Sequence, residues 1–167
     1  CWGYVRCAAE LMQQLGAETK VDVFSAVSSA GTHCGLMLGK ALFGLSNWRM
    51  VGVPVSDSIE FFQRELRALE RETVRQFKLD LDESQTPIEL IDGFIGDGYA
   101  IPFPAALETT RVLARTEGIL LDPTYTSKAM TGAISTIRAG AVRPGAVPAF
   151  IHTGGVFGLM ARRDLFI

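Results

Sequence analysis

Apolar positions along the chain follow two spacings, one typical of helices and the other of short buried strands. The helical spacing predicts helices over 4–15, 33–45, 59–77, 104–115 and around 130–137. Compact apolar runs predict strands over 21–27, 50–55, 87–94, 118–121 and 149–152. Because the strands are short, apolar on both faces and alternate with helices, we expect an α/β fold with a parallel, Rossmann-like sheet and helices on both faces.

Individual residues refine this picture at the helix ends. Gly16 follows the first helix as a stop signal, and Asp57 and Glu60 are expected to form a capping pair before the third. The second helix is apolar on nearly every side, which indicates burial, so we expect Cys34 to pack in the core.

The composition is that of a single globular domain. The chain has 167 residues, 48% hydrophobic and 20% charged, with a net charge of -2. This balance lacks the basic footprint of a nucleic-acid binder, and no apolar run is long enough to span a bilayer. Three cysteines without a CxxC pair argue against a disulfide scaffold or a metal site, so we expect a cytoplasmic protein. Because the chain begins with Cys1 and not Met, at the start of a predicted helix, we also expect a fragment.

Candidate chemistry lies in the loops that follow the strands, because ligands of open α/β sheets bind at the carboxyl ends. The loop 28–33 combines small residues with the hydroxyls of Ser29 and Thr32 before a buried helix. Backbone amides and a helix N-terminus could there hold a phosphate without a lysine. An ordinary helix cap is the simpler reading of this loop alone. The chain lacks both the GxGxxG and the P-loop patterns, which argues against a nucleotide site.

Three further loops present polar or aromatic side chains. The turn 96–99 presents Tyr99, and 122–128 presents Tyr125, with Thr126 or Ser127 expected to cap the next helix and Lys128 expected in solvent. The loop 152–155 follows the last strand with two glycines, and His152 is more simply a hydrogen-bonded core histidine than a base. Each of these loops alone is compatible with a purely structural role.

Their order and spacing together are more specific. The blocks 3–5, 28–32, 96–99, 121–128 and 151–155 resemble the second half of the D-cysteine desulfhydrase and 1-aminocyclopropane-1-carboxylate (ACC) deaminase family. The resemblance implies a pyridoxal-phosphate enzyme of the tryptophan-synthase-β fold type (fold type II). Residues 1–167 would then be the C-terminal part of its larger, cofactor-binding domain.

The resemblance also implies roles for particular residues. The cofactor phosphate would be held by Ser29, Ala30, Gly31 and Thr32, with Ser28 at the edge and Gly154 also contacting the cofactor. Tyr125 matches the active-site tyrosine and Tyr99 a second tyrosine near the substrate. Thr153 or Thr126 would offer a hydroxyl near the pyridine nitrogen. A neutral partner there leaves the ring a weaker electron sink, which suits β-elimination.

Two departures favour one branch of this family. The deaminases carry Glu directly after the tyrosine, where this chain has Thr126, and they tend to lack Thr in the final motif, where it has Thr153. The resemblance therefore implies a lyase that converts D-cysteine to pyruvate, sulfide and ammonia. ACC deaminase and cysteate sulfo-lyase activities remain alternatives.

The family's Schiff-base lysine and its Asn-His substrate loop are absent from this sequence. The four lysines are Lys20, Lys40, Lys78 and Lys128, and Lys128 matches a family lysine that does not hold the cofactor. We therefore expect the isolated chain to be inactive, and the alternative to an enzyme is a truncated fragment that binds cofactor weakly or not at all. Full-length members act on small amino acids and are commonly homodimers.

Overall fold

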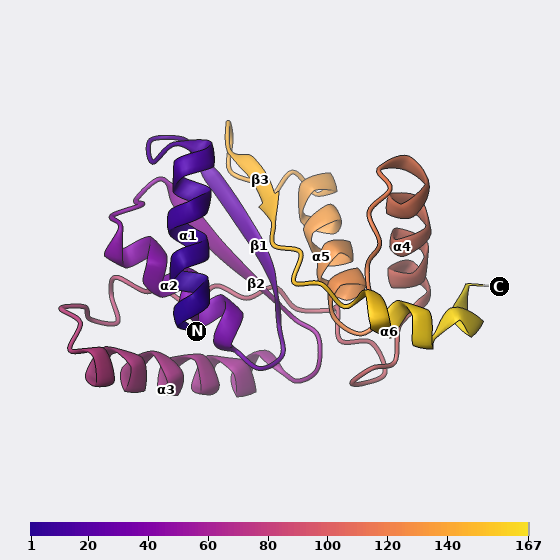
Figure 1. Ribbon diagram of the computed structural model, residues 1–167, viewed down its shortest axis with the longest axis horizontal. Coiled ribbons are helices and arrows are strands. Elements are labelled where there is room, and N and C mark those ends of the chain that lie inside the picture. The colour runs from indigo at the N-terminus through magenta and orange to yellow at the C-terminus, as the bar shows by residue number, and fades with distance from the viewer. Residues whose placement is uncertain (167) are drawn as a thin grey trace.

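The structure, a computed structural model, describes residues 1–166 and centres on a parallel sheet (Figure 1). The strands are β1 (Val21–Val27), β2 (Trp48–Pro54) and β3 (Val147–Phe150), in the order β2-β1-β3. The helices are α1 (Trp2–Leu15), α2 (Gly31–Leu42), α3 (Ile59–Phe77), α4 (Pro104–Thr116), α5 (Thr126–Arg138) and α6 (Val156–Ala161), followed by a 3-10 turn at Arg163–Leu165. The predicted parallel α/β fold is confirmed.

Both faces of the sheet are covered because its strands carry apolar side chains on both sides. Val23 of β1 packs into the cluster that contains α1 and α2, whereas Phe24, the next residue, packs against Ala133 of α5. Figure 1 shows the resulting layers, with α1 and α2 on one side of the strands and α5 and then α4 on the other. The alternation of side chains along a strand is the cause of this arrangement.

The contact between α1 and α2 depends on two glycines one helical turn apart. A Cβ on Gly35 would lie 2.2 Å from the carbonyl oxygen of Cys1, and a Cβ on Gly39 would lie 2.5 Å from the Cβ of Ala8. Neither gap admits a methyl group, so the two helix backbones approach closely only because both positions are glycine.

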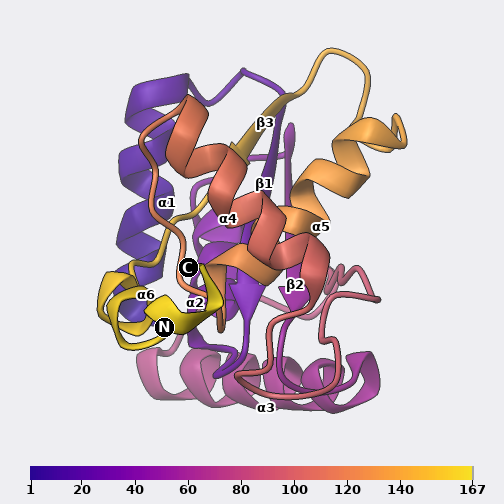
Figure 2. The same cartoon turned by 90° about the vertical axis from the view of Figure 1, so that its right-hand side faces the viewer.

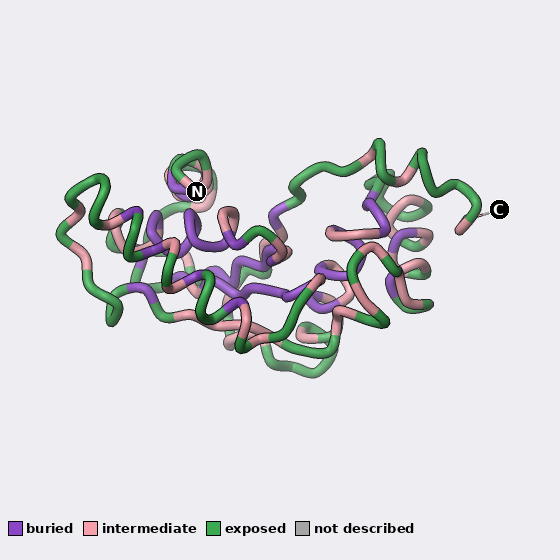
Figure 3. Tube along the Cα trace, turned by 90° about the horizontal axis from the view of Figure 1, so that it is seen from below, coloured by how far each residue is buried: buried purple, intermediate pink, exposed green. Residues whose placement is uncertain are grey.

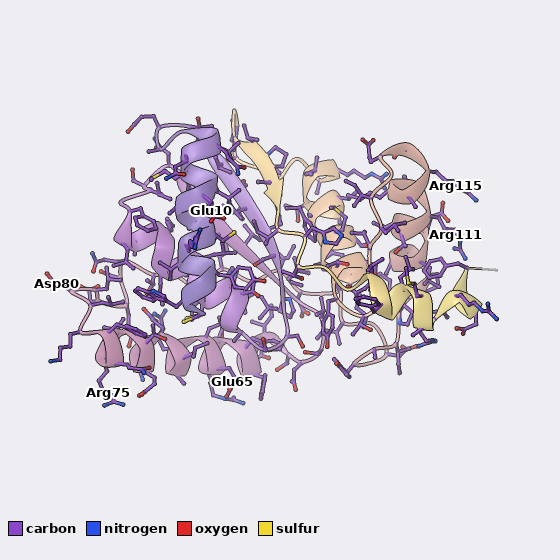
Figure 4. All side chains as sticks on the ribbon, viewed as in Figure 1. Glu10, Glu65, Arg75, Asp80, Arg111 and Arg115 are labelled. Carbon is purple, nitrogen blue, oxygen red and sulfur yellow. The ribbon has the colours of Figure 1, made fainter. Side chains whose placement is uncertain are left out.

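Helix α3 crosses the end of the sheet at which the strands terminate (Figure 2). Its buried side includes Phe62 and Leu66, and Figure 4 shows Glu65 and Arg75 pointing away from the body of the molecule. The helix is capped by Ser58, whose hydroxyl accepts from the Phe61 N–H at 3.2 Å, and not by the predicted pair at 57 and 60. The carboxylate of Asp57 instead accepts the N–H of Ser58, which holds the capping residue in place.

Two predicted strands do not form among the described residues. The segment 87–94 meets β2 only at one bridge, where Gly52 and Leu90 pair. Pro87 has no N–H to donate and Gly93 has a φ of +95°, so extended pairing stops on both sides of that bridge. The segment 118–121 begins with Gly118 at a φ of +69° and has no neighbouring strand. An apolar run forms a strand only where a second strand lies beside it.

Burial follows this architecture along the chain. Figure 3 shows the buried positions concentrated along the strands and the helices that face them, whereas the segment from His152 to the end of the described chain is largely exposed. Within residues 1–166, none of the helices is both long and apolar enough to cross a membrane.

Candidate functional site

A cleft of about 250 Å³ opens at the carboxyl end of β1. Its walls come from three loops that lie far apart in the sequence. The lining residues are Ala26, Ser28, Ser29, Ala30, Thr32, Tyr125 and Thr153. Parallel strands end at the same edge of a sheet, so the loop after β1, the start of α5 and the segment after β3 meet there (Figure 1). The structure thus brings together the loops that the sequence motifs singled out.

The loop between β1 and α2 forms a cradle of hydroxyls and amides. Ala30, the N-cap of α2, has a left-handed backbone with a φ of +64° and supplies no capping side chain. The first N–H groups of an α-helix have no intrahelical partner, so the amides around Gly31 are available to a ligand. Ser28 and Thr32 add hydroxyls, and the Ser28 hydroxyl lies 3.0 Å from that of Ser56 at the end of β2. These donors suit an anion.

A pair of tyrosines stands at the mouth of the cleft. The hydroxyls of Tyr99 and Tyr125 are hydrogen-bonded to each other, and the ring centroids are 5.9 Å apart. The hydrogen bond to Tyr99, assisted by burial and by the negative charge of Asp122, raises the pKa of Tyr125 to about 12. The Tyr125 phenol therefore keeps its proton at neutral pH and can donate it. Tyr99 is 57% exposed and reaches the site through Tyr125.

Asp122 positions Tyr125 by capping α5. One carboxylate oxygen accepts the N–H groups of Thr124 at 2.8 Å and Tyr125 at 2.9 Å, and the other accepts the N–H of Thr126 at 2.8 Å. The cap was expected from Thr126 or Ser127. An aspartate followed by proline before a helix start is a signal that could have identified it.

Thr126 lies beneath the cleft and not in its wall. Its side chain is buried, its hydroxyl donates to Asp122 at 2.7 Å and the same oxygen accepts the Asp122 N–H at 2.8 Å. Because the hydroxyl is engaged on both sides, the expectation that Thr126 contacts the cofactor is not supported. Thr153 lines the cleft and is the threonine that remains for that role.

The loop after β3 is shaped by His152 and two glycines. The His152 Nδ1 accepts the N–H of Gly154 at 3.0 Å, so its Nε2–H donates to the carbonyl of Leu120 at 2.9 Å. The histidine is hydrogen-bonded as expected, but it is exposed and not in the core. Its bond engages the Gly154 amide, which is therefore not free for a ligand. Gly155 is required because a Cβ there would lie 2.6 Å from the Asp122 Cβ.

Lys128 is buried, contrary to the expectation that it lies in solvent. Its ammonium group donates to the main-chain carbonyls of Ile95 at 2.5 Å and Gly98 at 2.9 Å. Burial lowers its pKa. Sequence reasoning missed this contact, because nothing in the local pattern indicates that the turn 95–98 lies against the start of α5.

His33 lies under the cradle and faces the interior. Its Nδ1 is 3.0 Å from the hydroxyl of Ser25, its ring is fully buried, and burial lowers its pKa to about 4. The ring is therefore neutral at physiological pH and supports the cradle without contributing charge to it. Within residues 1–166, no group of three or more potential metal ligands is present.

The buried His33 predicts loss of stability in mild acid. The unfolded chain binds a proton near pH 6.5, whereas the folded chain resists it until about pH 4. The free energy of unfolding should therefore fall by about 3 kcal/mol from this group as the pH drops from 7 to 4. Urea unfolding measured across this range gives the free energy of unfolding as a function of pH. This free energy should change less steeply with pH in His33→Gln than in the unchanged chain, and equally steeply in His152→Gln. Equal pH dependence in all three proteins would show that His33 is not the group responsible.

Comparison with known proteins agrees with this geometry. Residues 1–154 match the family described as "Pyridoxal-phosphate dependent enzyme". The D-cysteine desulfhydrase of Salmonella typhi is 37% identical over 162 residues, covering 95% of this chain and 48% of that protein. The D-cysteine desulfhydrase of Salmonella paratyphi B gives the same identity and coverage. The chain thus spans about half the length of the curated relatives it matches.

Solved structures give the same result. An ACC deaminase homologue superposes with a TM-score of 0.85 at 30% identity, over 98% of this chain and 48% of that chain. An O-ureido-L-serine synthase superposes with a TM-score of 0.59 at 16% identity, over 93% of this chain and 46% of that chain, which shows a shared fold. The resemblance predicted from the motifs is confirmed, and the chain belongs to the family of pyridoxal-phosphate dependent enzymes.

Proposed function

We propose that this chain is the C-terminal, cofactor-holding part of a lyase that converts D-cysteine and water to pyruvate, sulfide and ammonia. The observation that carries the proposal is the convergence of an anion cradle, a protonated tyrosine and Thr153 on one cleft. The D-cysteine desulfhydrases at 37% identity support the choice of substrate.

The donors in the cleft fit the phosphate of pyridoxal phosphate. Ser28, Ser29 and Thr32, with the backbone amides around Gly31, would hold the dianion through hydroxyl and amide hydrogen bonds. Bound pyridoxal phosphate supplies an electron sink for the bonds at the α-carbon of an amino acid. No lysine or arginine lines the cleft, so the dianion would depend on oriented dipoles.

Thr153 is the residue we assign to the pyridine nitrogen. A threonine hydroxyl is neutral and, unlike a carboxylate, does not stabilise a protonated ring nitrogen. A ring held by this hydroxyl would be a weaker electron sink, which would suit β-elimination better than reactions that need a long-lived carbanion.

Tyr125 is the residue we assign to the leaving sulfur. Its raised pKa keeps the phenol protonated at neutral pH, so its hydroxyl can donate a hydrogen bond to the departing sulfur. Tyr99 accepts from or donates to the same hydroxyl and thereby orients it. Asp122 fixes the backbone of Tyr125 from below.

The lysine that binds the cofactor covalently must come from outside this chain in our proposal. Lys128 is buried and directed at main-chain carbonyls, and the remaining lysines, Lys20, Lys40 and Lys78, do not line the cleft. The relatives are about twice as long, which leaves room for that residue and for the substrate-binding loop. We further propose a homodimer, and a reducing cytoplasm for its three free cysteines.

The proposal is tested by supplying D-cysteine to the longer protein that contains this chain. We expect equimolar sulfide and pyruvate, and no release of 2-oxobutyrate from ACC. The opposite pattern, with turnover of ACC and no sulfide, would assign the chain to the deaminase that its 30% identical structural neighbour represents. Turnover of neither compound would overturn both assignments.

The isolated chain provides an independent test of the division into two parts. With pyridoxal phosphate and borohydride, we expect no aldimine absorbance near neutral pH and no covalent adduct on Lys128 or Lys40, because neither lysine lines the cleft. Peptide mapping by mass spectrometry reads this out. An adduct at Lys128 or Lys40 would show that the chain carries its own covalent anchor.

A further inference from the structure

One cation in this molecule is held entirely by main-chain carbonyls. The Lys128 side chain is fully buried, and its ammonium group donates to Ile95 O at 2.5 Å, Gly98 O at 2.9 Å and Val55 O at 3.5 Å. An ammonium group has three N–H bonds, and three carbonyls face it, so the site matches the protonated amine. No carboxylate within residues 1–166 forms an ion pair with it.

Such a residue is a poor choice for stability alone. Burial of the ammonium is unfavourable, and the charge of Asp97 in the same turn offsets this only in part. Lys128 also lies in the first turn of α5, where the helix dipole disfavours positive charge. An apolar side chain of the same length would pack there without this cost. What the ammonium provides, and an apolar side chain cannot, is hydrogen bonds to the carbonyls of the turn.

The turn that Lys128 contacts has few other restraints. Gly96, Gly98 and Ala100 have positive φ values of 69°, 147° and 59°. The turn belongs to no helix or strand, and its backbone hydrogen bond, from Ile101 N to Gly98 O, measures 3.3 Å. Tyr99 is 57% exposed, and its ring contacts the ring of Tyr125 on one side only.

We propose that Lys128 is a positioning residue that clamps the turn 95–98 so that Tyr99 reaches the hydroxyl of Tyr125. Lys128 follows Tyr125 by three residues, so a single turn of α5 carries both the active tyrosine and the clamp for its partner. Any movement of the start of α5 therefore carries both tyrosines together. That Lys128 holds the turn 95–98 rests on the contacts alone. That this affects catalysis rests on the proposed function of Tyr125.

The structural part is tested by amide hydrogen exchange on the chain itself. Lys128→Met keeps the apolar stem and removes the ammonium, and Lys40→Met is the matched control, since burial also lowers the pKa of Lys40. Loss of the bond to Gly98 O should loosen the turn and raise exchange of the Ile101 amide, whose N–H donates to the same oxygen, by about tenfold or more in Lys128→Met. No change there, or an equal change in Lys40→Met, would overturn the proposal.

A second measurement needs no variant, in case Lys128→Met fails to fold. Brief acetylation of the native chain should leave Lys128 unmodified while exposed Lys78 reacts, and denaturant should abolish the difference. Reaction of Lys128 at the rate of Lys78 in the native chain would show that the amine is not held in the carbonyl site.

The functional part is tested by a double-mutant cycle in the longer protein. If Lys128 acts through Tyr99, Lys128→Met and Tyr99→Phe should each lower kcat/KM by about tenfold, and the double variant should lose little more than either single variant. A general structural defect would instead give additive losses, which would overturn the inference. If the longer protein has no activity on D-cysteine, the proposed function fails while the exchange result still decides the clamp.

Discussion

Replacing Tyr125 with phenylalanine is expected to lower kcat/KM for D-cysteine by about a hundredfold, the effect of removing a hydrogen-bond donor from developing charge at a reacting centre. The change deletes only the hydroxyl, and the ring keeps its place because Asp122 holds the backbone at this position. The visible absorbance of the bound cofactor should persist, because the phosphate cradle lies on a different loop. Steady-state kinetics and an absorbance spectrum of the longer protein measure both effects.

Tyr4→Phe is the matched control for this experiment. Tyr4 lies on α1, is not among the residues that line the cleft, and its hydroxyl forms no hydrogen bond to the described part of the chain. The control should retain full activity. Full activity in Tyr125→Phe would remove this tyrosine from the chemistry, and loss of the cofactor spectrum would show that it acts in binding.

Replacing Asp22 with asparagine is expected to lower the free energy of unfolding by about 3 kcal/mol. The Asp22 carboxylate is fully buried near the start of β1 and accepts from Arg143 Nε at 2.6 Å, Arg143 N at 3.0 Å and Arg49 Nη1 at 3.3 Å. Both guanidinium groups are partly exposed, so solvent reduces the penalty of leaving them unpaired, and the estimate takes the lower end for a broken buried pair.

Urea unfolding of the chain measures this loss, with Asp80→Asn as the control. Asp80 is an exposed residue in the loop after α3 and forms no ion pair with the described residues (Figure 4). Its replacement should leave the midpoint unchanged. Equal midpoints for Asp22→Asn and the control would show that the network between the strands and the loop before β3 adds no stability.

Local pattern was sufficient for most of the fold. The helix over Ile59–Phe77 was predicted to the residue because its apolar positions keep a helical period over its whole length. The strand Val21–Val27 was also predicted to the residue, because it is a compact, mostly apolar run that ends at a loop of small and polar residues. The strand predictions over 87–94 and 118–121 were wrong, because a strand forms only beside a second strand. The pattern of a single segment does not show whether such a neighbour is present.

The sequence also predicted part of the site and missed the rest. The motif order predicted which loops matter, and the structure brings Ser28, Thr32, Tyr125 and Thr153 into one cleft. The motif order did not predict that the Thr126 side chain turns inward to Asp122, or that Lys128 is buried against main-chain carbonyls.

Residue type and spacing alone were enough for the class of fold, the family and the loops that bear chemistry, since these depend on periodicity and on short motifs. Which side chain enters the cleft and which supports it depended on contacts between segments distant in the chain. A threonine before a helix can face a ligand or a buried aspartate, and a lysine can face water or three carbonyls. Only the packing of the loops around them decides which partner is within reach.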